Sequence, residues 1–284
     1  RPSPEFTVSN SSTISFIGAG NMASAIIGGM LDNGYQAGNI WVSAPDDSHL
    51  QALRDRFGVS VTTDNRHCAQ QADMVVLAVK PQVMAEVCRD IAPVVQNTRP
   101  LLVSIAAGLG SDTLDSWLGG GLPLVRVMPN TPSLVGKGAA GLFANVAVTA
   151  EQKTMVQSVF ESIGSALWVD DEEQLHGVTA LSGSGPAYFF LMLEALEAAA
   201  TEAGIAPKTA RELAIQTMAG AAEMAARSEH DPAQLKRNVM SPGGTTERAI
   251  NTFEDGGMRD LVQKAYNAAF ERSQEMSKEL ADKQ

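Results

Sequence analysis

The chain has 284 residues, enough for two domains that each bury a core, and its composition is that of a soluble globular protein. The net charge of −11 argues against a nucleic-acid partner. The two cysteines, Cys68 and Cys88, lie outside any C-x-x-C motif and indicate a reducing compartment, so we expect a cytoplasmic protein. The longest uncharged stretch, 174–193, contains histidine, proline and a Ser/Gly cluster, so we expect no membrane span.

Residues 1–12 are polar and have no apolar segment of the signal-peptide kind. The Glu5-Phe6 pair resembles a cloning remnant. We therefore expect residues 1–12 to be a disordered tail or such a remnant, outside the fold.

The stretch 13–23, TISFIGAGNMA, joins a short apolar run to a glycine turn and to a helical pattern that continues to Leu31. Gly18, Gly20 and Ala23 fit the G-x-G-x-x-G/A pattern, in which bare backbone N–H groups at a helix start bind a pyrophosphate. The pattern alone is weak, because an ordinary strand-to-helix turn also produces it.

Strands and helices alternate through the next 140 residues or so. We expect strands at 40–43, 59–62, 74–79, 101–105, 124–127 and 166–169, helices at 46–57, 81–91, 111–118 and 149–163, and a short helical link at 65–71. Residues 139–148 read as a further strand at the sheet edge. This alternation predicts a parallel, doubly wound sheet, and in that context the glycine turn indicates a dinucleotide.

From residue 171 the pattern becomes helical. Helices are expected at 174–203, 207–227, 232–239, 245–253 and 257–282. The chain is therefore predicted to consist of an α/β Rossmann-like domain, 13–170, and an all-α domain, 171–284. The Ala- and Met-rich faces of these helices suit a core and a subunit interface equally well.

Four strand ends border the expected dinucleotide site. Ser43 stands where NAD-binding proteins usually carry Asp or Glu, which favours NADPH over NADH, although no arginine adjoins it to pair with a 2′-phosphate. Lys80 either neighbours the cofactor or is a solvated helix start. The small residues of 104–108 would let a nicotinamide ring approach the backbone, and the loop 128–132, with two prolines, either covers the site or is a plain turn.

Two Gly/Ser-rich breaks interrupt the helical half. Residues 181–186, LSGSGP, weaken a helix unless another group must approach closely. Residues 241–246, SPGGTT, form a turn that feeds a helix and offers N–H groups and hydroxyls to a small carboxylate. The alternative is a simple helix cap, which needs only one Ser or Thr.

The four histidines are scattered without ligand spacing, so we expect no metal site. No Ser-His-Asp set or G-x-S-x-G elbow is present either. The chemistry is therefore expected to come from a cofactor, positioned by the protein.

The chain resembles the pyrroline-5-carboxylate reductases along almost its whole length after the N-terminal tail. The motifs that carry the resemblance are FIGAGNMA, LAVKPQ, VSIAAG, RVMPNTP, LSGSGPAY and NVMSPGGTT, in that order. The resemblance implies reduction of 1-pyrroline-5-carboxylate to L-proline with NADPH or NADH. It also implies a homodimer built by the helical domain, with further assembly such as a decamer.

The resemblance also implies site residues. Cofactor contacts are implied for Gly18, Ala19, Gly20, Asn21, Met22, Ser43, Asn65, Ala78, Val79, Lys80, Ala106 and Ala107. Substrate contacts are implied for Glu172 at the pocket rim and for Asn238, Ser241, Gly243, Gly244, Thr245 and Thr246. Thr246 is the expected catalytic residue, whose hydroxyl orients the imine nitrogen. In such dimers the substrate loop of one subunit meets the cofactor of the other.

Two other functions fit the same domain plan. A β-hydroxyacid dehydrogenase would need a catalytic lysine on the interdomain helix, but after the 182–185 cluster the next lysine is Lys208. A catalytically inactive dinucleotide sensor would not need the intact 241–246 turn. Both features favour the reductase.

Overall fold

The computed structural model describes residues 11–283, so most of the expected tail at 1–12 lies outside the described residues. The chain divides into two compact units, Arg1–Ser184 with Ala269–Gln284 (unit 1) and Gly185–Ala268 (unit 2). The sequence placed the division near residue 171 instead. Unit 1 extends to residue 184 because Val178 packs on Gly141 of its sheet. The C-terminal residues belong to unit 1 as well, because Leu280 packs on Gly108.

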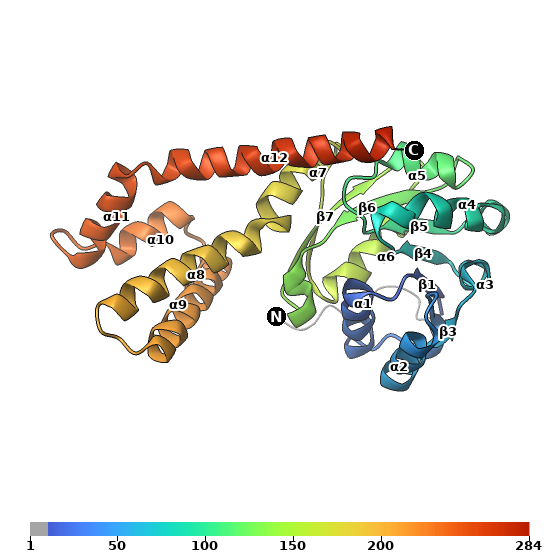
Figure 1. Ribbon diagram of the computed structural model, residues 1–284, viewed down its shortest axis with the longest axis horizontal. Helices are drawn as coiled ribbons and strands as arrows, with labels where there is room; N and C mark the ends of the chain where they lie inside the picture. The colour runs from blue at the N-terminus through green and yellow to red at the C-terminus, as the bar shows by residue number, and fades with distance from the viewer. Residues whose placement is uncertain (1–10, 284) are drawn as a thin grey trace. The chain divides into compact units, whose positions relative to one another are not determined.

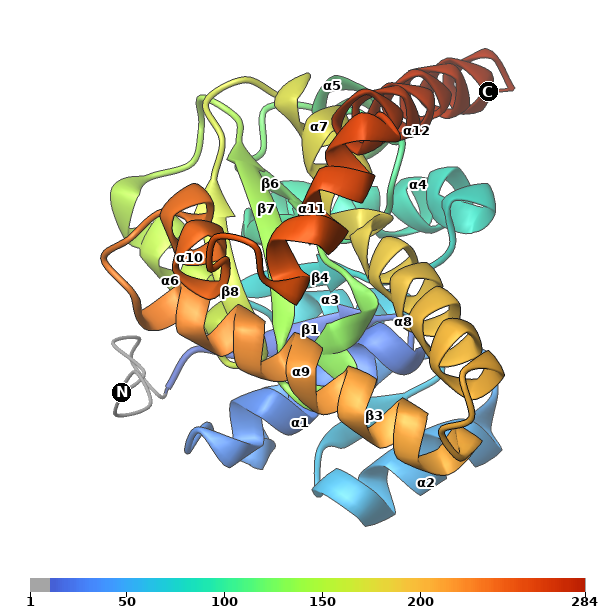
Figure 2. The same ribbon diagram turned by 90° about the vertical axis from the view of Figure 1, so that its left-hand side faces the viewer.

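Unit 1 is built on one eight-stranded sheet, in the order β3-β2-β1-β4-β5-β6-β7-β8 (Figure 1). The strands are β1 (Ile14–Ile17), β2 (Ile40–Ser43), β3 (Ser60–Thr62), β4 (Met74–Leu77), β5 (Leu101–Ser104), β6 (Leu124–Met128), β7 (Gly138–Ala144) and β8 (Gly164–Trp168). Every pairing is parallel except that of β6 with β7, which lie side by side in Figure 2. The sheet is thus doubly wound with one antiparallel step.

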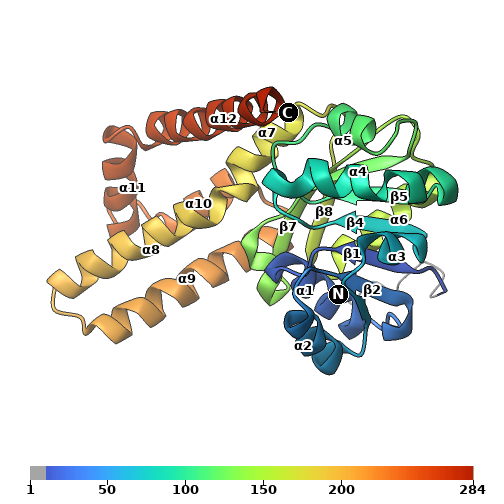
Figure 3. The same ribbon diagram turned by 45° about the vertical axis from the view of Figure 1, so that its right-hand side comes forward.

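Helices cover both faces of the sheet (Figure 3). One face packs against α1 (Asn21–Asp32), α2 (Asp47–Phe57) and α6 (Ala150–Glu161), and the other against α3 (Asn65–Gln70), α4 (Pro81–Thr98) and α5 (Ser111–Trp117). In β1, Phe16 joins the first core and Ile17 the second. Burial on both faces explains why the central strands are almost continuously apolar.

The helix α4 and the strand β7 differ from the sequence expectations. The helix expected to stop at residue 91 continues through Pro93, because Ile91 and Val95 are both buried in the core and outweigh one lost hydrogen bond. β7 ends at Ala144, where Asn145 accepts from the backbone N–H groups of Leu124 and Ala147 and turns the chain. β7 also lies between β6 and β8, so β8, not β7, forms the sheet edge.

The helix expected over 174–203 is interrupted. It consists of α7 (Gln174–Val178), a π-turn (η3, Thr179–Gly183) and α8 (Gly185–Glu202). Two single 3₁₀ turns, η1 (Ala37–Asn39) and η2 (Thr131–Val135), complete unit 1. The π-turn thus leads directly to the boundary between the units.

Unit 2 holds α8, α9 (Pro207–Arg227), α10 (Pro232–Val239), α11 (Thr245–Asp255) and the start of α12 (Met258–Asp282). Among its described residues, Ala210 is the only buried apolar side chain. Its large exposed apolar side chains include Tyr188, Phe189, Phe190, Leu191, Leu213, Ile215, Val239, Leu261 and Val262. Such a surface marks a protein interface. Among residues 11–283, every helix is too short or too polar to cross a bilayer.

Candidate cofactor and substrate sites

The turn between β1 and α1 is shaped for an anion. Gly18 has φ 109°, and a Cβ there would lie 2.5 Å from the carbonyl oxygen of Ala78, so only glycine allows this crossing of strand ends. Gly20 begins α1 without a side-chain cap, and a Cβ there would meet nothing within 4 Å. The first N–H that bonds within α1 is that of Ser24, to Gly20 O at 3.0 Å, so among the described residues the N–H groups of Asn21 and Met22 are left for a pyrophosphate.

The end of β2 is tied to this turn. The Gly18 N–H donates to the carbonyl oxygen of Ser43 at 2.8 Å. The Ser43 side chain is fully buried, and its hydroxyl donates to Oδ1 of Asn65 at 2.8 Å. Ser43 therefore positions Asn65, the half-buried first residue of α3, and Asn65 is the member of the pair that a ligand can reach.

The ends of β4 and β5 form the next wall. Ala78 and Val79 present their backbone to Gly18, and the exposed Lys80 precedes α4 without an acidic partner among residues 11–283. Ala106 is buried, its N–H bonded to Ser104 Oγ at 3.2 Å, while Ala107 is exposed. The expected cofactor residues, of which Gly18 is the first and Ala107 the last in the chain, thus all lie at or just after the carboxyl ends of neighbouring strands.

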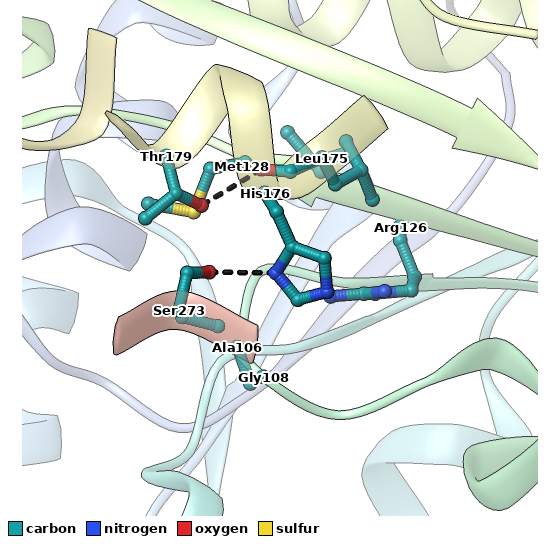
Figure 4. Close-up of a pocket in the computed structure, with 10 residues that line it drawn as sticks. Ala106, Gly108, Arg126, Met128, Leu175, His176, Thr179 and Ser273 are labelled. Carbon is teal, nitrogen blue, oxygen red and sulfur yellow. Dashed lines mark hydrogen bonds between the residues drawn. The ribbon is translucent and has the colours of Figure 1, made fainter. Parts of the chain in front are cut away.

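A small pocket adjoins the 106–108 loop (Figure 4). Its other walls come from the end of β6, from α7 and the π-turn, and from Ser273 of α12. Figure 4 shows the ring of His176 directed at Ser273, with Nδ1 2.7 Å from the hydroxyl oxygen. This hydrogen bond and the Leu280–Gly108 contact hold the end of α12 on unit 1. The residues that line this pocket come from four separate segments of the chain, so the sequence did not predict it.

Glu172 belongs to an internal network of unit 1. Its carboxylate accepts from the backbone N–H and the hydroxyl of Ser111, both at 2.8 Å, and from Arg126 at 3.0 Å. It thereby caps α5, whose N-terminus has no cap of its own. Arg126 Nε is buried without a partner among the described residues. The structure thus gives Glu172 a supporting contact to Arg126, which lines the pocket, and the rim position that the family resemblance implied stays a prediction.

The LSGSG segment, 181–185, covers the end of the π-turn and the first residue of α8, and its small residues permit close packing. A Cβ on Gly183 would lie 2.8 Å from Cε of Met128. Asn130 holds the same turn, because its Nδ2 donates to the carbonyl oxygen of Ser182 at 3.0 Å and its Oδ1 accepts from Ala139 N at 2.8 Å. Asn130 was not singled out from the sequence as more than part of a rigid loop.

In unit 2 the 241–246 turn joins α10 to α11. Gly243 has φ 74°, and a Cβ on Gly244 would lie 2.6 Å from Ser241 Oγ, so both glycines are required by the turn. α11 has no side-chain cap, which excludes the simple capping role. The hydroxyls of Thr245 and Thr246 make no hydrogen bond within residues 11–283, and with the first N–H groups of α11 they offer a small carboxylate several donors.

Asn238 stands at the end of α10, with Oδ1 accepting from Gln234 at 2.7 Å and its amide group exposed. Asn238, Ser241 and Thr246 thus belong to unit 2, together with the rest of the implied substrate loop. The implied cofactor residues and Glu172 belong to unit 1.

Residues 11–283 contain no group of His, Cys, Asp and Glu side chains arranged to hold a metal ion. Cys68 and Cys88 are free and buried. Burial raises the pKa of the Cys68 thiol to about 11 and that of Cys88 to about 12, so both stay protonated and unreactive.

Two family models match the chain. Residues 172–276 match a model described as pyrroline-5-carboxylate reductase dimerisation, and residues 13–108 match one described as NADP oxidoreductase coenzyme F420-dependent. The pyrroline-5-carboxylate reductase of Pseudomonas aeruginosa is 46% identical over 267 residues, which cover 94% of this chain and 97% of that protein.

Solved structures agree. A pyrroline-5-carboxylate reductase from Coxiella burnetii is 44% identical with a TM-score of 0.92, covering 94% of this chain and 98% of that one. The Plasmodium falciparum pyrroline carboxylate reductase, whose crystal structure has NADP bound, is 31% identical with a TM-score of 0.82. The match covers 95% of this chain and 100% of that one.

Proposed function

The chain belongs to the pyrroline-5-carboxylate reductase family, and we propose that it reduces the C=N bond of 1-pyrroline-5-carboxylate to give L-proline, the final step of proline biosynthesis. NADPH, with NADH as a second possibility, supplies the hydride. The observation that carries this proposal is that one chain has two helix starts without a side-chain cap. One follows the glycine turn at Gly20, and the other, at 244–246, carries two hydroxyls.

The cofactor residues act by binding and orientation. The α1 N–H groups beyond Gly20 would hold the pyrophosphate, and Asn65, positioned by Ser43, would contact the adenosine end. The small Ala106–Ala107 segment would lie along the nicotinamide, and Arg126, held by Glu172, lines the same pocket. Fixing the ring in this way supplies acceleration through proximity.

The substrate residues need no strong acid. A cyclic imine is basic enough to be protonated in water, and the resulting iminium accepts hydride readily. The N–H groups at the start of α11 would bind the substrate carboxylate, and the Thr246 hydroxyl would orient the imine nitrogen. The exposed amide of Asn238 would support the same turn.

The protein is a homo-oligomer, since the dimerisation model matches and unit 2 exposes apolar faces that one chain leaves uncovered. We propose further that each site is shared, with the 241–246 loop of one subunit meeting the cofactor residues of its partner, and that dimers assemble into higher oligomers such as decamers. Sedimentation velocity measures the assembly. A cytoplasmic location is proposed from the two free, buried cysteines.

A steady-state assay with 1-pyrroline-5-carboxylate against NADPH and NADH tests the activity. Consumption of NADPH that depends on the imine supports the reductase, whereas binding of NADPH without turnover would support a dinucleotide sensor. A β-hydroxyacid substrate that reduces NADP⁺ would support the dehydrogenase instead.

Subunit complementation tests the shared site. Gly20→Val fills the open space at the phosphate turn, and Thr246→Ala removes the loop hydroxyl. In mixed dimers of the two variants, a shared site leaves one site with both halves intact, so about a quarter of wild-type activity returns on random mixing. A site formed within one chain leaves every site damaged, and activity stays at the level of the separate variants.

A further inference from the structure

His49 lies against the phosphate turn, although no motif includes it. It occupies the first turn of α2, three residues after the capping Asp46. Its Nε2 is hydrogen bonded to the carbonyl oxygen of Ala19, between Gly18 and Gly20. The imidazole thus bridges the segment after β2 and the glycine turn, and it remains exposed to solvent.

This location corresponds to the ribose end of a dinucleotide. In doubly wound folds, the residues that follow the second strand discriminate a ribose 2′-hydroxyl from a 2′-phosphate. Here Ser43 is buried and bonded to Asn65, and Ala44 and Pro45 offer no side-chain donor. The Ser48 hydroxyl donates to Oδ1 of Asp46 at 2.7 Å, so His49 is the first side chain after β2 whose donor is left for an anion at this position.

Asp46 does not take the role that an acidic residue has in NAD-binding proteins. Its Oδ1 accepts from the hydroxyl of Ser48 at 2.7 Å and from the N–H groups of Ser48 and His49 at 3.0 and 3.3 Å. These bonds, led by the Ser48 hydroxyl, hold the pKa of Asp46 below its usual value. The carboxylate is thus occupied in capping α2 and is not directed at ribose hydroxyls.

We propose that His49 binds the 2′-phosphate of NADPH and makes this chain favour NADPH over NADH; the inference rests on the proposed function. With Nε2 held by Ala19, Nδ1 of the protonated ring donates to the phosphate. The positive end of the α2 dipole also attracts the phosphate dianion.

Few charges oppose this arrangement. Asp46 and Asp47 lie on the same turn as His49. The neighbouring segments, 18–24 and 60–62, which contact α2, and 43–45, which precedes it, carry no ionisable side chain. The two aspartates keep the phosphate affinity moderate.

Calorimetric titration of the cofactor-free protein tests the proposal without turnover, with adenosine 2′,5′-bisphosphate and AMP as ligands. The wild type binds the bisphosphate more tightly. His49→Gln retains an N–H for Ala19 but removes the charge, so affinity for the bisphosphate falls about tenfold while that for AMP is unchanged. His49→Lys restores the preference.

Arg56→Gln is the matched control. It removes a cation from the last turn of the same helix, where the guanidinium lies 4.6 Å from the centroid of the Phe57 ring, and it leaves the ligand preference unchanged. A preference that survives His49→Gln, or an equal loss for both ligands, overturns the assignment of His49. Equal binding of the two ligands by the wild type also overturns the assignment of His49, but it is compatible with the proposed cofactor site. Wild-type protein that binds neither ligand overturns the cofactor site as well.

Discussion

Truncation of Glu172 separates a structural role from a substrate-binding role. Its carboxylate accepts three hydrogen bonds, two from Ser111 and one from Arg126. The side chains of Arg126 and Glu172 are 12% and 23% exposed. Breaking a buried pair costs about 3–5 kcal/mol, because the remaining charge stays buried, and partial access of water favours the lower end, about 3 kcal/mol.

Glu172→Ala is therefore expected to lower Tm by about 6–12 °C, given about 2–4 °C per kcal/mol for a unit of this size. Thermal and urea unfolding measure the change, together with KM for the imine. Glu173→Ala is the control, since the Glu173 side chain is 74% exposed and, among residues 11–283, its carboxylate meets only His176, at 3.6 Å. That variant should change stability by less than about 0.5 kcal/mol.

A double-mutant cycle isolates the ion pair. Arg126→Met keeps the volume of the side chain and removes the buried cation, so the double variant should be less damaged than the sum of the single variants, with a coupling of at least about 1 kcal/mol. A Glu172→Ala protein that unfolds at the wild-type temperature but has a strongly raised KM would refute this reasoning and return Glu172 to the substrate pocket.

Three further predictions concern the glycine turn, the substrate loop and the buried thiols. Gly18→Ala should cost about 2–4 kcal/mol of unfolding free energy, because of the positive φ and the clash with the Ala78 backbone. Gly20→Ala should change the unfolding free energy by less than about 1 kcal/mol and mainly weaken NADPH binding. Equal unfolding curves for the two variants would contradict this. Thr246→Ala should lower kcat while NADPH binding, followed by fluorescence titration, survives, and wild-type turnover would remove Thr246 from the mechanism. Burial raises the pKa of Cys68 to about 11 and of Cys88 to about 12, so the unfolded chain loses these protons at lower pH than the folded chain. The free energy of unfolding should therefore fall as pH rises from about 9 towards 11–12, and unfolding midpoints that rise over this range would argue against it.

Much of the fold was predictable because its signals are local. The bounds of α9 and α10 and the extent of β2 agree with the sequence patterns, since Pro at a helix start and an unbroken apolar run depend only on near neighbours. The path of α4 through Pro93 was not predictable, because the burial of Ile91 and Val95 that stabilises it depends on the packed sheet.

The sequence by itself determined the two glycine turns, at 18–22 and at 241–246, because each is a contiguous motif with a glycine at positive φ, Gly18 and Gly243. Their roles in binding cofactor and substrate stay predictions. The tertiary structure alone decided the partners of isolated side chains. It placed Glu172 on Ser111 and Arg126, buried Ser43 behind Asn65, and set His49 against Ala19. These contacts join segments distant in the chain, and only the folded sheet brings such segments within hydrogen-bonding distance.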